Sequence, residues 1–398
     1  MKKTCLSVLG ILLTLFSSFA QPAEKDSSQY KNRKLKLEEI NLVSSYYRQN
    51  GNNSAVTGGI GTEKLTDLSN TIDVKLTRWD KKDRKHSYDI EIGFDHYSSA
   101  SSDNIDPNTM SGASHADSRL FPSVNWSREN ANKGTTVGAG ISFSSEYDYQ
   151  SIGANLLFSK KTKNGAGEIT GKLQAYLDQL KYILPIEFRP PGSGEGDDYE
   201  SKARNSFSGS LSYSQIMNQR LQLMLTAEFV HQQGYLGLPF HRVYMNTSTV
   251  AVEKLPDTRT KIPIGLRANY FLGDKIILRG FYRYYQDNWG LNAHTASLEV
   301  PVKITPFLSV IPFYRYYTQT AVDYFAAYRL HKLTDQYYTS NYDLSKFNSN
   351  FYGAGFKMVP AKGVFGIQRL NTLELRYGHY TRTNGLNSDI LTLNVKFK

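Results

Sequence analysis

The pentapeptide FYRYY occurs twice, at residues 281–285 within GFYRYYQDN and at residues 313–317 within PFYRYYTQT. In an extended strand, successive side chains point to opposite faces. The phenylalanine, the arginine and the last tyrosine therefore share one face, and the two middle tyrosines share the other. An arginine that faces lipid at the middle of a bilayer costs roughly 2–4 kcal/mol, so a membrane-crossing strand would turn its arginine inward.

This orientation turns the middle tyrosines of both repeats toward lipid. At headgroup depth such residues form aromatic girdles. The four predicted girdle residues are Tyr282, Tyr284, Tyr314 and Tyr316. The alternative is a strand of a soluble sandwich, in which neighbouring groups would bind the tyrosine hydroxyls.

The same alternation of apolar and polar residues recurs along most of the chain. It is clearest in ILTLNVKFK (residues 390–398) and is also visible at residues 88–95, 223–229 and 264–270. Beyond residue 20 no apolar run approaches the ~20 residues of a spanning helix, whereas a tilted strand needs only about 9–11. The pattern predicts an all-β, transmembrane antiparallel β-barrel.

The connections between these segments are of two alternating kinds, short turns and long polar loops. Counting them predicts sixteen strands over residues 37–398, the first near residues 37–49. The short turns would be periplasmic and the long loops extracellular. One tight turn, at residues 149–151, is expected on the long-loop side. The Gly- and Ser-rich stretch 119–158 leaves fourteen strands as the alternative.

The N-terminal residues predict export. Lys2 and Lys3 precede an apolar run at 6–16 and a small-residue site at 18–20, the pattern of a cleaved signal peptide over residues 1–20. Residues 21–36 would then form a periplasmic tail, and the barrel would lie in the outer membrane of a Gram-negative bacterium. The only cysteine, Cys5, lies within the signal, which excludes disulfides and thiolate chemistry from the mature chain.

Charged residues on the inward faces predict the lining of a pore. The basic candidates are Arg267, Arg279, Arg283, Arg315 and Arg376. The acidic candidates are Asp89, Glu91, Asp95 and Glu228. In a sixteen-strand barrel the strand of Asp89 lies opposite the strand of Arg279, which resembles the transverse field of porin constrictions. The alternative is pairing between neighbouring strands, for example of Lys75 with Asp89 or Glu91.

Two further kinds of site have weaker signals. Carboxylates that could offer oxygen ligands to calcium are Asp103, Asp106, Asp117, Glu146 and Asp148, although their spacing is not that of an EF-hand and a solvated loop is the alternative. The local pairs His96 with Ser98 and Ser114 with His115 are candidates for a lipid or ester hydrolase. No zinc, phosphate-loop or nucleic-acid motif is present, and no cofactor is expected. The glycine-rich segment 50–70 is expected to fold inward or to cap the lumen.

Five stretches carry a family resemblance: NNSAVTGGIGTEKLTD (52–67), DHYSSASSD (95–103), EYDYQS (146–151), LGLPFHRVY (236–244) and LRYGHYTRTNGLNSD (375–389). They resemble an uncharacterised family of exported proteins, a "domain of unknown function" grouping predicted to form Gram-negative outer-membrane barrels. The resemblance covers the whole mature chain and implies location and fold. It also implies a setting near periplasmic thioredoxin-like and flavin-transfer proteins.

The function predicted from these observations is porin-like passage of small hydrophilic solutes with a preference for anions, rather than catalysis. One alternative is a structural or assembly barrel linked to a periplasmic redox or cofactor-maturation system, its lumen plugged by the tail, by segment 50–70 and by segment 322–347. The other alternative is the hydrolase. The expected partners are outer-membrane lipid, the barrel-insertion machinery, small polar solutes and, by analogy with porins, further copies of the chain, but not nucleic acid.

Overall fold

The computed structural model describes residues 33–98, 116–189, 199–247 and 249–398. The predicted signal peptide and most of the predicted tail lie outside the described residues, as do Asp103, Asp106, Ser114 and His115. Within the described ranges, none of the helices combines the length and the hydropathy needed to cross a membrane.

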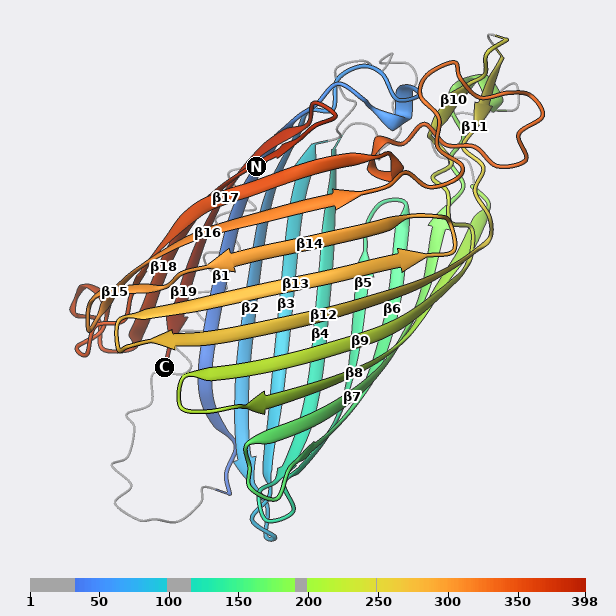
Figure 1. Ribbon diagram of the computed structural model, residues 1–398. Helices are drawn as coiled ribbons and strands as arrows, with labels where there is room; N and C mark the ends of the chain where they lie inside the picture. The colour runs from blue at the N-terminus through green and yellow to red at the C-terminus, as the bar shows by residue number, and fades with distance from the viewer. Residues whose placement is uncertain (1–32, 99–115, 190–198, 248) are drawn as a thin grey trace, which may run out of the picture.

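The described strands form one closed antiparallel barrel (Figure 1). Its strands are β1 (Lys36–Asn50), β2 (Leu65–Trp79), β3 (Lys85–Ser98), β4 (Ala116–Asn130), β5 (Thr135–Ser145), β6 (Tyr149–Lys161), β7 (Gly167–Lys181), β8 (Ser201–Ile216), β9 (Leu221–Gly234), β12 (Thr258–Leu272), β13 (Ile276–Asp287), β14 (Asn292–Glu299), β15 (Val302–Thr305), β16 (Leu308–Gln319), β17 (Phe347–Met358), β18 (Leu370–Arg382) and β19 (Asn387–Phe397). Neighbours in sequence are neighbours in the sheet, and β1 closes the barrel by pairing with β19.

Two of these elements are one interrupted strand. Both β14 and β15 pair with β13 on one side and β16 on the other. The break falls at Val300-Pro301, where proline has no N–H to donate to the ladder. Its carbonyl still accepts from Ile277, and the Val300 N–H donates to Pro312 O. The barrel therefore has sixteen strands, which confirms the predicted count.

Short and long connections alternate as predicted, with one correction on the long-loop side. The tight turn between β5 and β6 lies at residues 146–148, whereas residues 149–151 belong to β6. The turn closes early because the Glu146 N–H donates to Tyr149 O at 2.8 Å. Tyr149 is then held in the sheet, where its hydroxyl donates to Asp178 of β7.

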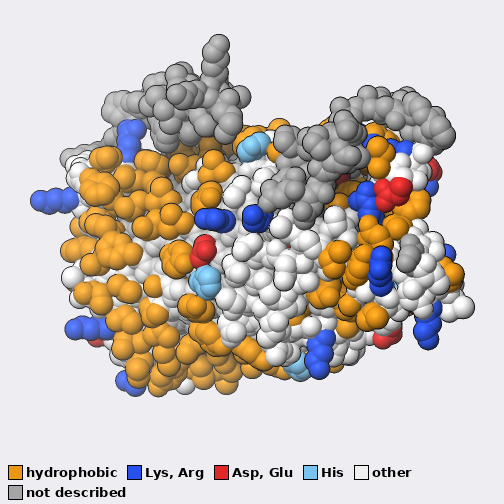
Figure 2. All heavy atoms as spheres, turned by 90° about the horizontal axis from the view of Figure 1, so that it is seen from above, with side chains coloured by type: hydrophobic (Ala, Val, Ile, Leu, Met, Phe, Trp, Pro, Cys, Tyr) orange, Lys and Arg blue, Asp and Glu red, His pale blue; other side chains and the backbone are white. Residues whose placement is uncertain are grey.

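The outward face of the barrel is apolar. Large aliphatic side chains along it are more than half exposed, among them Ile141 (67%), Leu156 (60%) and Leu173 (61%). Figure 2 shows hydrophobic side chains over a broad part of one face, with few charged groups among them. So continuous an apolar surface would promote aggregation in water but matches the hydrocarbon of a bilayer. The barrel is thus a transmembrane barrel.

The buried apolar cluster lies at the long-loop end rather than between sheets. Trp289, Leu291, Ala293 and Val322 pack together there. Further chain folds over this end and is called the cap below; it comprises residues 51–61, 235–247, 249–257 and 320–346. The cap contains the hairpin β10 (Arg242–Tyr244) and β11 (Val250–Val252) and the short helices η1 (Ala55–Thr57) and η5 (Tyr342–Leu344). Outside it are η4 (Ile186–Phe188) and η6 (Val364–Gly366).

Within the cap, segments distant in sequence are joined by backbone and side-chain contacts. Met245 bridges to His331, and Lys254 bridges to Tyr338. The glycine-rich segment after β1 packs against the same hairpin, because the Arg242 guanidinium donates to Val56 O at 3.0 Å. The glycine-rich segment thus belongs to the loop end of the barrel.

Candidate pore lining

The inward faces of β12, β13 and β16 carry arginines. The alternation places Arg267, Arg279, Arg283 and Arg315 opposite the outward leucines and tyrosines of the same strands. All four belong to the exposed class although they point into the barrel. Their guanidinium groups therefore reach water inside the barrel.

Two of the five predicted basic residues are held by one carboxylate that the sequence interpretation missed. Glu299 of β14 accepts from Arg279 at 2.8 Å and from Arg376 at 2.6 Å. Arg376 belongs to β18, so it reaches Glu299 across two strands. It lies beside Gly355 of β17 and over the ring of Phe313 of β16. Glu299 therefore neutralises part of the positive charge of the inward-facing arginines.

The other three arginines have no carboxylate within ion-pair distance among the described residues. Arg315 lies over the ring of Phe351, 4.9 Å from its centroid, and Arg267 lies over Phe281 at 5.6 Å. Such contacts orient a guanidinium group without cancelling its charge. Arg283 makes neither an ion pair nor a side-chain hydrogen bond with any described residue. These three residues leave uncompensated positive charge on one side of the lumen.

Three of the four acidic candidates, those on β3, lie on the opposite side. The ring order places β3 eight strands from β13 in either direction, and Figure 1 shows β13 in front and β3 behind. Asp95 accepts from Ser69 at 2.6 Å. Lys75 lies directly opposite Asp89 in the ladder, and Asp73 lies opposite Glu91. Within the described chain, Lys75 makes no ion pair with Asp89 or Glu91. Arg279 does pair with Glu299, its ladder partner on the neighbouring strand, so the alternative of neighbour pairing applies to that predicted basic residue.

The remaining acidic candidate, Glu228, is separate from this wall. It lies on β9, opposite Ser210 of β8, with the exposed Phe229 beside it on the outward face. The structure therefore groups the β3 carboxylates together and leaves Glu228 apart.

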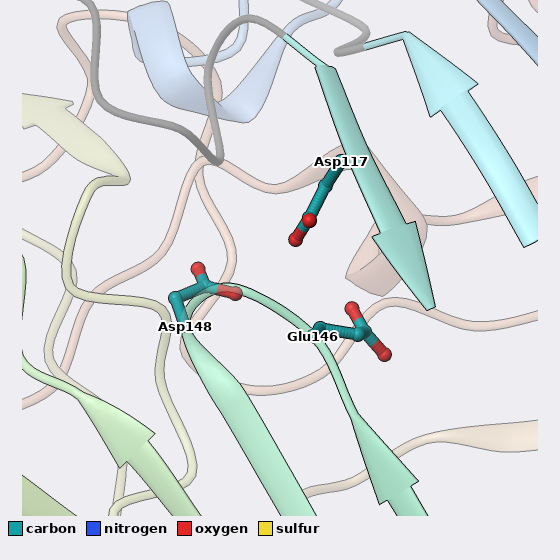
Figure 3. A group of neighbouring side chains, drawn as sticks. All are labelled: Asp117, Glu146 and Asp148. Carbon is teal, nitrogen blue, oxygen red and sulfur yellow. The ribbon is translucent and has the colours of Figure 1, made fainter. Parts of the chain in front are cut away.

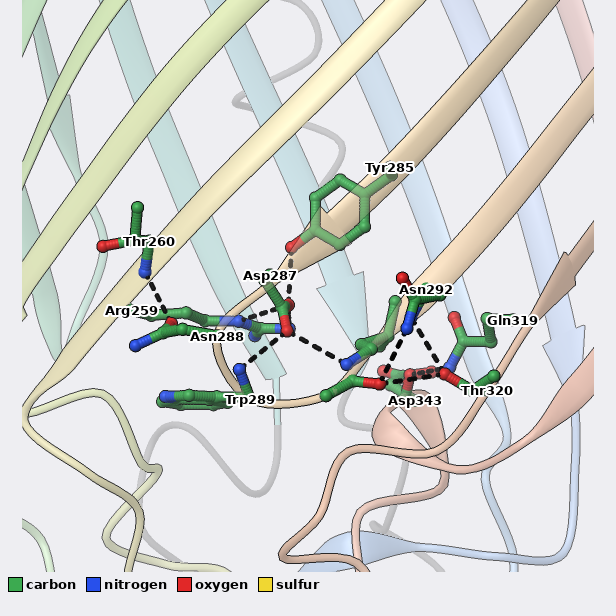
Figure 4. Close-up of polar contacts among 12 residues, drawn as sticks. Arg259, Thr260, Tyr285, Asp287, Asn288, Trp289, Asn292, Gln319, Thr320 and Asp343 are labelled. Atoms are coloured by element: carbon green, nitrogen blue, oxygen red, sulfur yellow. Dashed lines mark hydrogen bonds and ion pairs between the residues drawn. The ribbon is translucent and has the colours of Figure 1, made fainter.

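A network of hydrogen bonds around Asp287, called the Asp287 network below, lies at the loop end of β13 (Figure 4). Asp287, at the end of β13, has a fully buried side chain. Its Oδ2 accepts from Arg259 at 2.5 and 2.9 Å and from the Tyr285 hydroxyl at 2.8 Å. Its Oδ1 accepts from the N–H groups of Trp289 and Leu291. The Asp287 network thus connects β12, β13 and the turn after β13.

The cap has a buried polar centre of its own. Glu253 is 4% exposed and accepts from the Leu238 N–H at 2.9 Å and from the Thr339 hydroxyl. His241 Nδ1 lies 3.6 Å away, an ion-pair distance. Burial alone would raise the pKa of Glu253, but His241 and these donors together hold it below its ordinary value. Glu253 is therefore a charged residue, and it connects the cap segments 235–247 and 249–257 to the cap segment 320–346.

Three of the predicted metal candidates come together at the loop end (Figure 3). Asp117 of β4 and Glu146 and Asp148 of the next turn have ligand atoms within 4.8 Å of one another. Burial and the charges of Asp117 and Glu146 raise the pKa of Asp148 to about 6. Glu146 already has partners, because Arg119 lies 3.4 Å away and Tyr97 donates to it. A bound cation at this site stays a prediction.

Both members of the candidate hydrolase pair, His96 and Ser98, have hydrogen-bond partners on other strands. His96 instead contacts Ser118, with 2.9 Å between Nδ1 and Oγ. Ser98 accepts from the Thr66 N–H. Residues 96 and 98 of one strand share a face, but the ladder places His96 beside Ser118 of β4. No carboxylate among the described residues orients the His96 ring, so this pair lacks the third member of a triad.

The four predicted girdle tyrosines share the outward face. Tyr282, Tyr314 and Tyr316 are 45%, 47% and 38% exposed. The hydroxyls find partners on the same face: Tyr282 pairs with His294 Nδ1 at 2.7 Å, and Tyr314 donates to Asn350 at 2.7 Å. Tyr284 donates to Asn292 at 3.0 Å. A ring that meets lipid and a hydroxyl that is hydrogen-bonded suit the headgroup region.

Comparison with known proteins adds a family and distant structural likenesses. The family described as "Protein of unknown function (DUF3570)" matches residues 95–388. No curated protein matches. Among solved structures, OccK1 (OpdK) of Pseudomonas aeruginosa is similar at 8% identity and a TM-score of 0.43, over 92% of this chain and 99% of that one. A BenF-like porin from Pseudomonas fluorescens Pf-5 is similar at 10% identity and 0.41, over 92% and 100%.

A mutant of the ferric enterobactin receptor PfeA from Pseudomonas aeruginosa is similar at 11% identity and a TM-score of 0.46, over 87% of this chain and 54% of that one. Because these TM-scores are below 0.5, the barrel fold is assigned from the strand pairing of this chain and not from these likenesses.

Proposed function

Since the chain belongs to the DUF3570 family of proteins of unknown function, as its sequence resemblance predicted, we propose a function from the lumen itself: passage of small hydrophilic solutes, with a preference for anions. The barrel would lie in an outer membrane, with its short turns in the periplasm and its cap outside. Its partners would be lipid on the apolar face and small polar solutes within.

One observation carries this proposal. Arg267, Arg283 and Arg315 point inward, are exposed within the barrel and have no carboxylate partner among the described residues. A purely structural lumen has no need of unpaired, hydrated charge, and burying such charge costs several kcal/mol per ion. In a water-filled lumen the same groups cost little and attract anions.

A planar-bilayer measurement tests the proposal. Refolded protein should give discrete conductance steps, and a KCl gradient should give a reversal potential of the sign that anion preference requires. Replacing Arg267, Arg283 and Arg315 together by Gln should abolish that preference. The matched control replaces Lys81, Lys82 and Arg220 by Gln, because these three exposed cations lie in the short turns. Folded protein without conductance would contradict the proposal.

A capped structural barrel is the second candidate, and the cap favours it. Segments from three loops meet over the loop end and are joined through Glu253, Thr339 and Arg242. If the folded barrel were silent in bilayers but conducted after deletion of residues 323–343, the second candidate would replace the first.

A further inference from the structure

A cavity of 220 Å³ lies between the inward wall and the cap. Its floor is made by β13 and β14, and β16 supplies one side. Residues 343 and 344 of the cap cover it. The cover is held in place because Gln319 of β16 donates to Asp343 O at 2.9 Å and the Val322 N–H donates to Leu344 O at 3.0 Å. The cavity is therefore a built part of the loop end.

Among the described residues that line the cavity, one charged side chain has no oppositely charged partner. Arg259 is neutralised by Asp287, and Asp343 is neutralised by Arg382 at 2.5 Å. Arg283, which also lines the cavity, keeps an unpaired guanidinium group. Such a group presents a planar fork of N–H donors that fits a carboxylate in a bidentate manner.

The rest of the lining is apolar or aromatic. Leu291, Ala293 and Leu344 contribute aliphatic surface, and Tyr285 and Tyr317 contribute rings. Both tyrosine hydroxyls are already engaged, since Tyr285 donates to Asp287 and Tyr317 donates to Gln319 at 2.6 Å. Neither hydroxyl proton is free for an anion, so Arg283 is the principal anion donor and the rings offer their faces.

The volume sets the size of the guest. An enclosed cavity of about 150 Å³ is known to hold a benzene molecule, so this 220 Å³ pocket, which is open on one side, has room for one six-membered ring and one small substituent. A larger hollow of 600 Å³ exists on the outward face of β6–β9, but its walls include the exposed Leu156, Leu173 and Phe229, so it faces lipid rather than the lumen.

We propose that this cavity is a binding site for a small organic monoanion, namely a carboxylate attached to a flat apolar body of about one ring, with Arg283 as its carboxylate clamp. The inference deepens the proposed function and rests on it, because it names the class of solute that would pause in the lumen.

Binding is tested without ion flow, by ¹⁹F NMR of 4-fluorobenzoate with the full barrel in detergent micelles. The fluorine signal should broaden and shift saturably, and unlabelled benzoate should displace it. Neither benzamide, which lacks the charge, nor acetate, which lacks the ring, should compete at the same concentration. Displacement by acetate or sulfate as effective as by benzoate would overturn the apolar part of the site.

Variants locate the site. Arg283→Gln should weaken binding about tenfold or more, in line with loss of a charge-assisted hydrogen bond. Arg283→Lys keeps the charge without the fork and should weaken binding less, which also guards against misfolding of the Gln variant. Arg220→Gln removes an equal charge from a short turn at the other end of the barrel and should bind as wild type does. Unchanged binding by Arg283→Gln would refute the site.

The two proposals fail separately. Conductance without saturable benzoate binding overturns the cavity site and keeps the pore. Binding that depends on Arg283 in a barrel without conductance overturns the pore and keeps the site.

Discussion

The buried carboxylate of Asp287 should be the costliest single charge to remove from the barrel. Asp287→Ala deletes the acceptor for Arg259, Tyr285 and two backbone N–H groups at once. It also leaves the Arg259 side chain, which is 13% exposed, without its partner. Removing one member of a buried pair costs about 3–5 kcal/mol, which is the expected loss of unfolding free energy.

Two variants separate the contributions. Asp287→Asn keeps an oxygen for the Trp289 and Leu291 N–H groups but loses the charge, so it should cost less, about 1–3 kcal/mol. The matched control is Asp343→Ala, which breaks a pair of similar length, 2.5 Å to Arg382, but whose side chain is 64% exposed. Arg382 itself is only 19% exposed, so this pair is half-exposed and the control should cost about 1 kcal/mol, clearly less than Asp287→Ala.

The assay is equilibrium urea unfolding of the barrel refolded into lipid vesicles, followed by tryptophan fluorescence. Of the three tryptophans, Trp289 lies under the Arg259 guanidinium at 4.3 Å, so its share of the signal, measured in a variant with Trp79 and Trp126 replaced by Phe, reports on the hydrogen bonds of Asp287. Equal losses for Asp287→Ala and Asp343→Ala, or a loss below about 1 kcal/mol for Asp287→Ala, would refute the reasoning that burial makes this pair costly to break.

Three further predictions concern single carboxylates. Glu299→Gln removes one negative charge from the lumen and releases Arg279, while Arg376 keeps Glu374 at 3.7 Å. A charge sensed at about 8 Å gives ~0.5 kcal/mol at the dielectric constant of water and ~2 at an effective value of 20, so the anion-to-cation permeability ratio should rise at least about twofold. An unchanged reversal potential would contradict this. The pKa of Asp148 is raised to about 6, so its contribution to stability is present below the ordinary aspartate value near 4 and is lost as pH rises through about 6. The unfolding midpoint of the wild type should therefore fall between pH 4 and 7, and Asp148→Asn should make that fall smaller. An equal fall in the variant would show that Asp117, Glu146 and Asp148 are not its cause. Sensitivity of the wild-type midpoint to EDTA would instead support the predicted cation. The pKa of Glu253 is lowered, so its stabilisation is present above the ordinary glutamate value near 4.3 and is lost as pH falls through the folded value. Glu253→Gln should speed trypsin cleavage of the cap near Lys332 at neutral pH, with Glu200→Gln, a surface carboxylate that is 66% exposed, as its control; equal cleavage of the two variants would argue against Glu253 as the joint.

Much of the barrel was predictable because a membrane imposes simple rules on a strand. Alternation in ILTLNVKFK gave the outward row of β19, and the lipid cost of arginine oriented both FYRYY repeats. The count of sixteen followed from the alternation of short and long connections. The break at Pro301 was missed because proline interrupts the ladder of one strand without ending its pairing.

The contacts within the site could not be predicted in the same way. Glu299 and Arg376 are 77 residues apart and meet across two intervening strands, which depends on barrel curvature and side-chain reach. Because Leu298 is apolar and Glu299 is charged, alternation does predict that Glu299 faces inward. Its ion-pair partners could not be predicted. Glu253 and Thr339 come from separate loops, for which no periodic pattern exists. The turn at 146–148 brings Asp148 close to Asp117, and its Tyr147 N–H donates to Asp117 Oδ2 at 3.0 Å, a contact that depends on the folded turn.

The seam between β1 and β19 has a consequence for biogenesis. Ile40 pairs with Phe397, so the ladder that closes the barrel joins residues separated by almost the whole described chain. Until then, the edges of β1 and β19 are both open templates for pairing with other chains. Ladders of such long sequence separation form slowly. A barrel in which β1 and β19 are not yet paired therefore has two edges open to other copies, and a circular permutant that moves the seam to a short turn should shift these edges without altering the finished wall.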